Sequence, residues 1–292
     1  MYECRSAKHF FGLILLDILV FSICSVFFFT GKKLLSSSAD VNSEKSVFLP
    51  VIMYHSVFGG SPEEYIVTPV QFENDLAWLV KNGYTSVTAQ QLTDYVNDKG
   101  NLPDKPVMIT FDDGCYNNLS AVLPLLEKYD MHAIVSVVGQ YTDVTAENDP
   151  HVPSYSYLTW DDINRLISSG RVEIGNHTYN MHSFKGDRKG CSKNPSESEE
   201  EYISALTEDL NRLQSEIREH TGTLPVVFAY PFGFISKEST PVIRELGFTI
   251  TLTCSERPNH ITRNPECLYG INRYNRSGFY STEEFMNKIF KE

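Results

Sequence analysis

Two adjacent carboxylates follow an apolar run near the middle of the sequence. Residues 107–111 read Val-Met-Ile-Thr-Phe, and Asp112, Asp113 and Gly114 come directly after them. A short apolar run is typical of a buried strand, so both side chains are expected at its carboxyl end, where (β/α) barrels build active sites. Neighbouring carboxylates repel each other unless a cation or a proton lies between them. Taken alone, the segment also fits an ordinary turn with Gly114 at positive φ.

Two histidines, His177 and His182, follow another short segment that is expected to be a strand, at residues 172–175. Their spacing of five matches neither one face of a helix nor one face of a strand, so the imidazoles converge only if the chain turns between them. Two imidazoles and one carboxylate form a known type of catalytic metal site, which suits Zn²⁺ and admits Fe²⁺, Co²⁺, Ni²⁺ or Mn²⁺. Two polar loop histidines are the alternative. The position of both motifs at expected strand ends favours the metal site.

The elements that position these residues alternate between short apolar runs and helical patterns. Such alternation is typical of βαβ units and a parallel sheet. Strands are expected at residues 49–54, 84–87, 107–111, 133–138, 172–175, 226–230, 248–252 and 268–271. Helices are expected at residues 69–82, 89–98, 118–129, 160–169, 199–220, 241–246 and 282–290, with Thr68 and Thr159 as caps. The pattern predicts a (β/α) barrel of about seven to eight parallel strands.

The motifs resemble those of a known enzyme family. Thr110-Phe111-Asp112-Asp113-Gly114, Asn176-His177-Thr178 and His182-Ser183 are similar to the motifs of NodB-homology polysaccharide deacetylases, which are carbohydrate esterase family 4. The resemblance covers roughly residues 48–275 and implies a distorted barrel. It also implies that Asp112 is the general base and that Asp113, His177 and His182 hold the metal ion.

Two departures from the family pattern point to further residues. The third motif usually begins with arginine, but this chain has Ala229-Tyr230-Pro231-Phe232, and Arg273 is the candidate that orients Asp112 in its place. The family's late Leu-x-His motif, which supplies a general acid, has no clear match.

The branch that includes poly-N-acetylglucosamine deacetylases is similar in its histidine spacing of five. In that branch the order of elements is permuted and the acid lies on the first strand, in a setting like Tyr54-His55. The resemblance therefore makes His55 the general acid. A single histidine at a strand end would otherwise be interpreted as structural.

The resemblance implies hydrolysis of N-acetyl groups on an amino-sugar polysaccharide similar to poly-N-acetylglucosamine, with release of acetate. The metal ion and the Phe232 N–H would stabilise the oxyanion. Pro231 and Phe232 would line the substrate groove, and Trp160 or Tyr116 would stack on a sugar ring. Two alternatives stay open: a peptidoglycan amino-sugar deacetylase, and a carbohydrate-binding barrel without turnover, which the absent arginine motivates.

The amino-terminal part of the chain has a different character. Residues 9–30 are almost entirely apolar and long enough to cross a bilayer, which predicts an uncleaved membrane-spanning helix. We therefore expect a membrane anchor at residues 1–33, a linker at 34–47 and the deacetylase-like domain at 48–292. Basic residues flank the helix equally on both sides and leave its orientation open. The resemblance places the domain outside the cytoplasm.

Charge and cysteine content exclude other classes of protein. The net charge is −12, which makes the chain a poor nucleic-acid binder. The six cysteines include no CxxC pair, which excludes a cysteine zinc site. Cys254 and Cys267 are equally compatible with a disulfide and with free thiols.

Overall fold

The computed structural model describes residues 46–148 and 151–290. The expected membrane helix at residues 9–30 and nearly all of the expected linker lie outside these residues. Across the described part of the chain, no helix is both long enough and apolar enough to span a membrane.

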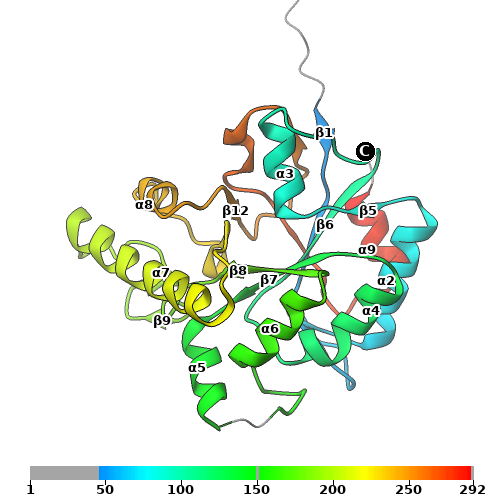
Figure 1. Cartoon of the computed structure of the whole chain (residues 1–292), viewed down its shortest axis with the longest axis horizontal. Coiled ribbons are helices and arrows are strands. Elements are labelled where there is room, and N and C mark those ends of the chain that lie inside the picture. The colour runs from blue at the N-terminus through cyan, green and yellow to red at the C-terminus, as the bar shows by residue number, and fades with distance from the viewer. Residues whose placement is uncertain (1–45, 149–150, 291–292) are drawn as a thin grey trace, which may run out of the picture. The chain divides into compact units, whose positions relative to one another are not determined.

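A central sheet of eight strands forms the framework of the domain (Figure 1). Seven strands follow one another in the order β12-β11-β8-β7-β6-β2-β14, and β5 pairs with β6. Their bounds are β2 (Val51–Tyr54), β5 (Thr85–Ser86), β6 (Pro106–Phe111), β7 (Ala133–Val137), β8 (Val172–Asn176), β11 (Val227–Ala229), β12 (Ile250–Leu252) and β14 (Tyr274–Asn275). All of these pairings are parallel. The expected seven to eight parallel strands are therefore present, in a half-barrel that is consistent with a distorted (β/α) barrel.

The last strand differs from its expected position. Residues 268–271 were expected to form it, but Pro265–Leu268 form a short 3₁₀ helix, η3. Ile271 pairs with Leu252 of β12 in an isolated parallel bridge, and β14 then pairs with β2. The segment from residue 271 to residue 275 thus links the two edges of the sheet, because consecutive parts of it pair with different edge strands.

Helices connect the strands and surround the sheet (Figure 1). They are α2 (Pro69–Lys81), α3 (Ala89–Val96), α4 (Leu123–Lys128), α5 (Gly139–Asn148), α6 (Trp160–Ser168), α7 (Glu199–Thr221), α8 (Ser239–Glu245) and α9 (Thr282–Ile289). Thr68 and Thr159 cap α2 and α6 as expected, each in a capping box. The helix α5 was not predicted, and the expected helix at 118–129 begins with a π-helical turn, η1 (Asn118–Val122).

Short strand pairs border the main sheet. Strand β1 (Val47–Phe48) pairs with β13 (His260–Ile261), and β9 (Phe184–Lys185) pairs with β10 (Arg188–Lys189), both antiparallel. Strand β3 (Ser56–Val57) pairs in parallel with β4 (Ile66–Val67), directly after His55. None of these two-residue strands was predicted, because they are too short to show a periodicity.

Aromatic packing and a buried ion pair fix the end of β2 that leads to His55. Tyr54 is 1% exposed, and its ring lies 5.1 Å from the rings of both Phe72 and Phe111. Its hydroxyl donates to Asp75 Oδ2 (3.0 Å), which also accepts from Arg276 Nε (2.7 Å). Asp75 and Arg276 are both fully buried, so the polar groups at this point of the core satisfy one another.

Candidate active site

The carboxyl ends of β2, β6 and β8 open into a cavity of about 430 Å³. Its wall includes six residues that the sequence singled out: His55, Asp112, Asp113, His177, His182 and Phe232. The parallel pairing of the strands brings them together, because parallel strands end at the same edge of a sheet.

Three of these residues form a cluster that fits a metal ion. One ligand atom each from Asp113, His177 and His182 lies within 4.8 Å of the other two. Asp113 Oδ1 is 3.2 Å from His182 Nε2 and 3.7 Å from His177 Nε2. The cluster has the two imidazoles and one carboxylate that the sequence predicted.

Hydrogen bonds turn the Nε2 atoms of both histidines toward Asp113. His177 Nδ1 lies 2.7 Å from the carbonyl oxygen of Ala229, which can only accept, so Nδ1 carries the proton. The hydroxyl of Tyr141 donates to the carbonyl oxygen of His182 (3.3 Å) and lies 3.3 Å from His182 Nδ1. Partners of this kind fix the tautomer and ring orientation of a metal-ligating histidine.

The protonation states also suit a divalent cation. Burial lowers the pKa of His177 to about 3 and lowers the pKa of His182, so both imidazoles are neutral near pH 7. Burial and the charge of Asp112 raise the pKa of Asp113 to about 6, against the opposing effect of His55. Asp113 Oδ1 is buried and has no hydrogen-bond partner among the described residues. Neutral imidazoles and an unsatisfied carboxylate oxygen fit Zn²⁺ or a similar ion.

Asp112 lies beside this cluster and is held by an arginine. Arg273 Nη1 and Nη2 donate to Asp112 Oδ1 and Oδ2, each at 2.7 Å, and both residues are buried. Burial by itself raises the pKa of Asp112, but the charge of Arg273 and its two hydrogen bonds lower it overall. Asp112 is therefore an ionised carboxylate with a fixed orientation.

Three of the six described non-glycine residues with positive φ lie in or next to the candidate site. Asp113, Thr178 and Phe232 have φ values of 70°, 72° and 56°, in the left-handed region that residues other than glycine rarely adopt. Gly114 follows at φ 71°, and a Cβ there would lie 2.9 Å from Val137 Cγ1. Strain of this kind is often retained at functional sites, where surrounding contacts hold it in place.

Two residues from other segments of the chain, Asn118 and Tyr65, hold His55 in place. Asn118 Nδ2, in the π-helical turn η1, donates to the carbonyl oxygen of His55 (3.1 Å). The ring of Tyr65 meets the imidazole edge to face, with ring centroids 4.7 Å apart. His55 Nδ1 is buried without a hydrogen bond to the described residues. The imidazole therefore borders the cavity with one ring nitrogen unpaired.

Of the residues expected to contact the sugar, only Phe232 lines the cavity. Phe232 is 38% exposed and packs on His182, with ring centroids 4.6 Å apart, whereas Pro231 is buried. Trp160 lies in a different cavity, where it stacks on His220 with ring centroids 4.5 Å apart.

Tyr65, which is 56% exposed, also lines the cavity and lies beside His55. Tyr116, the other expected stacking residue, packs on His151 instead, with ring centroids 4.7 Å apart. Sequence reasoning missed Tyr65, because nothing local distinguishes it from an ordinary loop tyrosine.

The cysteines carry no cross-link in the described structure. Cys254 and Cys267 are free thiols, which decides between the two states that the sequence left open. Cys254 lies in the cavity wall, where its Sγ is 3.9 Å from Arg273 Nη2.

The chain is similar to known deacetylases in sequence and in fold. A family model described as polysaccharide deacetylase matches residues 99–251. The poly-beta-1,6-N-acetyl-D-glucosamine N-deacetylase of Escherichia coli K12 is 26% identical over 195 residues, which is 61% of this chain but 29% of that protein.

Two solved structures are similar to this chain in fold. IcaB from Ammonifex degensii has a TM-score of 0.66 and 25% identity, covering 78% of this chain and 91% of its own. A de-N-acetylase from Aggregatibacter actinomycetemcomitans shares the fold, with a TM-score of 0.70 and 24% identity, covering 83% of this chain and 100% of its own. Since the family model spans more than half of the sequence, the chain belongs to the polysaccharide deacetylase family, a family of hydrolases.

Proposed function

We propose that this protein hydrolyses N-acetyl groups on a polysaccharide similar to poly-N-acetylglucosamine, with the help of one divalent metal ion, in the first place Zn²⁺. The observation that carries the proposal is the ionised, arginine-held Asp112 beside the cluster of Asp113, His177 and His182. A protein that only binds sugar does not need an oriented base next to a metal site. The name of the relative from Escherichia coli supports poly-N-acetylglucosamine as the substrate.

Asp113, His177 and His182 would hold the metal ion, and Asp112 would act as the general base. A bound divalent ion supplies Lewis acidity, which lowers the pKa of water and polarises the acetyl carbonyl. Asp112 accepts a proton from the attacking water as the oxygen bonds to the acetyl carbon. Arg273 keeps the carboxylate of Asp112 ionised and in a fixed orientation, because it donates a hydrogen bond to each of its oxygens. Arg273 itself does not line the cavity.

His55 would complete the reaction as the general acid. When the carbon–nitrogen bond breaks, the leaving nitrogen takes a proton from the imidazolium of His55, and acetate and a free amine are the products. The backbone N–H of Phe232 is the candidate donor to the oxyanion of the tetrahedral intermediate. Tyr65, exposed beside His55, borders the space where the sugar ring would lie.

We also propose that the protein is membrane-anchored through residues 9–30 and that its domain faces the polymer outside the cytoplasm. The apolar sequence of residues 9–30 supports the anchor. The proposed location of the domain outside the cytoplasm follows from the proposed substrate, because the domain must face the polymer there.

Acetate release from N-acetylglucosamine oligomers by the zinc-loaded full chain tests the function. We expect activity in the wild type, and a fall in kcat of about 10²- to 10⁴-fold for Asp112→Asn and for His55→Ala, the usual contribution of acid–base groups. Both variants should still bind zinc. The control is Tyr155→Ala, which removes an exposed aromatic side chain outside the cavity wall.

Three other results would change the proposal. If His55→Ala remains fully active, the acid lies elsewhere. Release of acetate from peptidoglycan fragments alone would change the substrate. A wild type that binds zinc and oligomer but releases nothing would be a carbohydrate-binding barrel.

A further inference from the structure

The loop between the two candidate histidine ligands is closed at both ends by local hydrogen bonds. The N–H of Thr178 donates to Asn176 Oδ1 (2.8 Å), and the N–H of Met181 donates to Thr178 Oγ1 (3.2 Å). Thr178 has a φ of 72°, so the chain reverses sharply just after His177. This turn is what allows histidines five residues apart to face one another.

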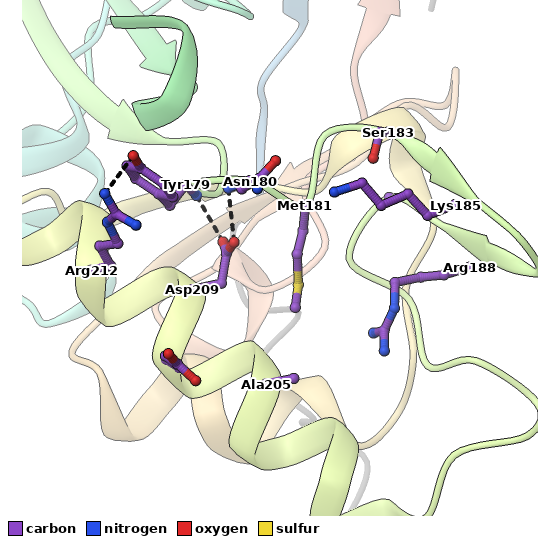
Figure 2. A pocket seen from close by; sticks show the side chains of 11 residues that line it. Tyr179, Asn180, Met181, Ser183, Lys185, Arg188, Ala205, Asp209 and Arg212 are labelled. Carbon is purple, nitrogen blue, oxygen red and sulfur yellow. Dashed lines mark hydrogen bonds between the residues drawn. The ribbon is translucent and has the colours of Figure 1, made fainter. Parts of the chain in front are cut away.

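The two N–H groups in the middle of the loop have a distant acceptor. Those of Tyr179 and Asn180 donate to Asp209, one to Oδ1 at 2.7 Å and the other to Oδ2 at 2.8 Å (Figure 2). Asp209 lies on α7, thirty residues along the chain. Each oxygen of the carboxylate serves one donor, which an amide side chain with a single oxygen cannot reproduce.

The same helix also holds the side chain of Tyr179. The guanidinium carbon of Arg212, about one turn after Asp209, lies 3.4 Å from the centroid of the Tyr179 ring. Figure 2 shows Asp209 and Arg212 reaching the loop from α7. The hydroxyl of Tyr179 donates in turn to Asp143 (2.9 Å). The loop is therefore fixed to α7 through both its backbone and a side chain.

The position of His182 depends on this loop more than the position of His177 does. His177 continues from β8, and its backbone N–H donates to Val137 of β7 (3.0 Å). His182 follows the turn, and its ring has Tyr141 as a polar neighbour besides Asp113. Ligand atoms must be held within about 0.5 Å of the productive geometry for a site to work well. Movement of the turn would change the distance between the two Nε2 atoms.

We propose that Asp209 is a positioning residue, which holds the loop between His177 and His182 in the turn that directs both imidazoles to one metal ion. The inference rests on the proposed metal site. Asp209 lies in the wall of a second cavity, of about 340 Å³ (Figure 2), which shares no lining residue with the cavity of the candidate active site. It therefore acts through the loop and does not touch substrate.

Zinc affinity of the full chain, measured by competition with a chromophoric chelator, tests the inference without substrate. We expect Asp209→Asn to weaken zinc binding by about 10- to 100-fold, the usual cost of losing a partner that orients metal ligands. Asp209→Ala should weaken it further, because it removes both acceptors. The matched control is Glu208→Gln, an exposed neighbour on the same helix, which should leave the affinity unchanged.

The absorption spectrum of the Co²⁺-loaded protein provides a second readout. A displaced His182 should weaken the visible bands of a tetrahedral site in Asp209→Asn and not in Glu208→Gln. If Asp209→Ala does not fold, the nearly isosteric Asp209→Asn decides the question.

Wild-type zinc affinity and an unchanged cobalt spectrum in a folded Asp209→Asn would overturn the inference. A lower melting temperature with unchanged zinc affinity would also overturn it, since Asp209 would then serve folding alone. Because the readout is metal binding, a wild type that binds zinc with Asp209-dependent affinity but releases no acetate would refute the proposed function and retain this inference.

Discussion

At the scale of single residues, the pairing of Asp112 with Arg273 determines the character of the site. Arg273 is fixed by more than Asp112, because its Nε also donates to the carbonyl oxygen of Thr253 (2.8 Å). A buried carboxylate without a cation would be expensive to ionise. The guanidinium removes this cost and prevents the carboxylate from rotating, since it occupies both oxygens.

Replacing the arginine should cost stability as well as activity. In Arg273→Gln, Asp112 stays buried without its partner, so we expect the free energy of unfolding to fall by about 3–5 kcal/mol, as for other broken buried pairs. Urea denaturation measures the loss. Asp112→Asn added to Arg273→Gln should restore part of it, because no buried charge remains.

The control for this experiment is Arg257→Gln, which removes an exposed arginine from the same part of the chain. Equal unfolding curves for Arg273→Gln and Arg257→Gln would contradict the role of the ion pair. A double variant whose loss in the free energy of unfolding equals the sum of the two single losses would contradict it as well.

At the scale of elements, the short strands β3 and β4 position His55 and Tyr65, which flank them and line the cavity. This strand pair packs against the carboxyl-terminal segment. Ser56 donates its backbone N–H to the carbonyl oxygen of Tyr65 (3.2 Å), and Gly278 donates its own to that of Glu63 (2.8 Å). A Cβ on Gly278 would lie 2.1 Å from the carbonyl oxygen of Ile66. Only glycine allows the two segments to approach this closely.

We therefore expect Gly278→Ala to displace β4 and, with it, Tyr65 beside His55. Overpacking of this kind typically costs about 1–3 kcal/mol, and acetate release should fall as the cavity wall moves. Thermal melting and turnover of the full chain measure the two effects. Gly59→Ala is the control, because a Cβ at Gly59 would meet no atom within 4 Å. Identical behaviour of the two variants would contradict this packing argument.

At the scale of the whole molecule, the proposed metal ion connects stability with function. Its candidate ligands come from the end of β6 and from the loop after β8, and they converge only when the sheet has formed. An ion that binds the native state and not the unfolded chain shifts the folding equilibrium by mass action.

Zinc should accordingly stabilise the protein against unfolding. With free zinc at about 100 times its Kd, the expected stabilisation is about 2.7 kcal/mol, and EDTA should reverse it. Thermal melting of the full chain with zinc and with EDTA measures the effect. In His182→Ala the difference between the two curves should shrink strongly. A zinc shift of the same size in that variant would place the binding at another site.

Much of the fold was predictable because its signals are local. Strands β6 and β8 lie within one or two residues of their expected bounds, and the caps of α2 and α6 are at Thr68 and Thr159. The closing segment was misplaced by a few residues, since its course depends on pairing with two different strands. The helix α5 was missed because "GQYTDVTAEN" has little apolar periodicity.

Residue types and positions are enough to predict where the candidate site lies and which residues could hold a metal ion. An Asp pair and two histidines at strand ends predict a metal site, because parallel strands end at one edge and these side chains are metal ligands. The resemblance of the motifs to those of polysaccharide deacetylases added the hydrolysis and the role of Asp112 as base. Folding alone establishes the contacts that orient them. Arg273 reaches Asp112 across 161 residues, and Asp209 reaches the histidine loop across about thirty. No local pattern encodes such contacts, because they arise where distant segments pack together.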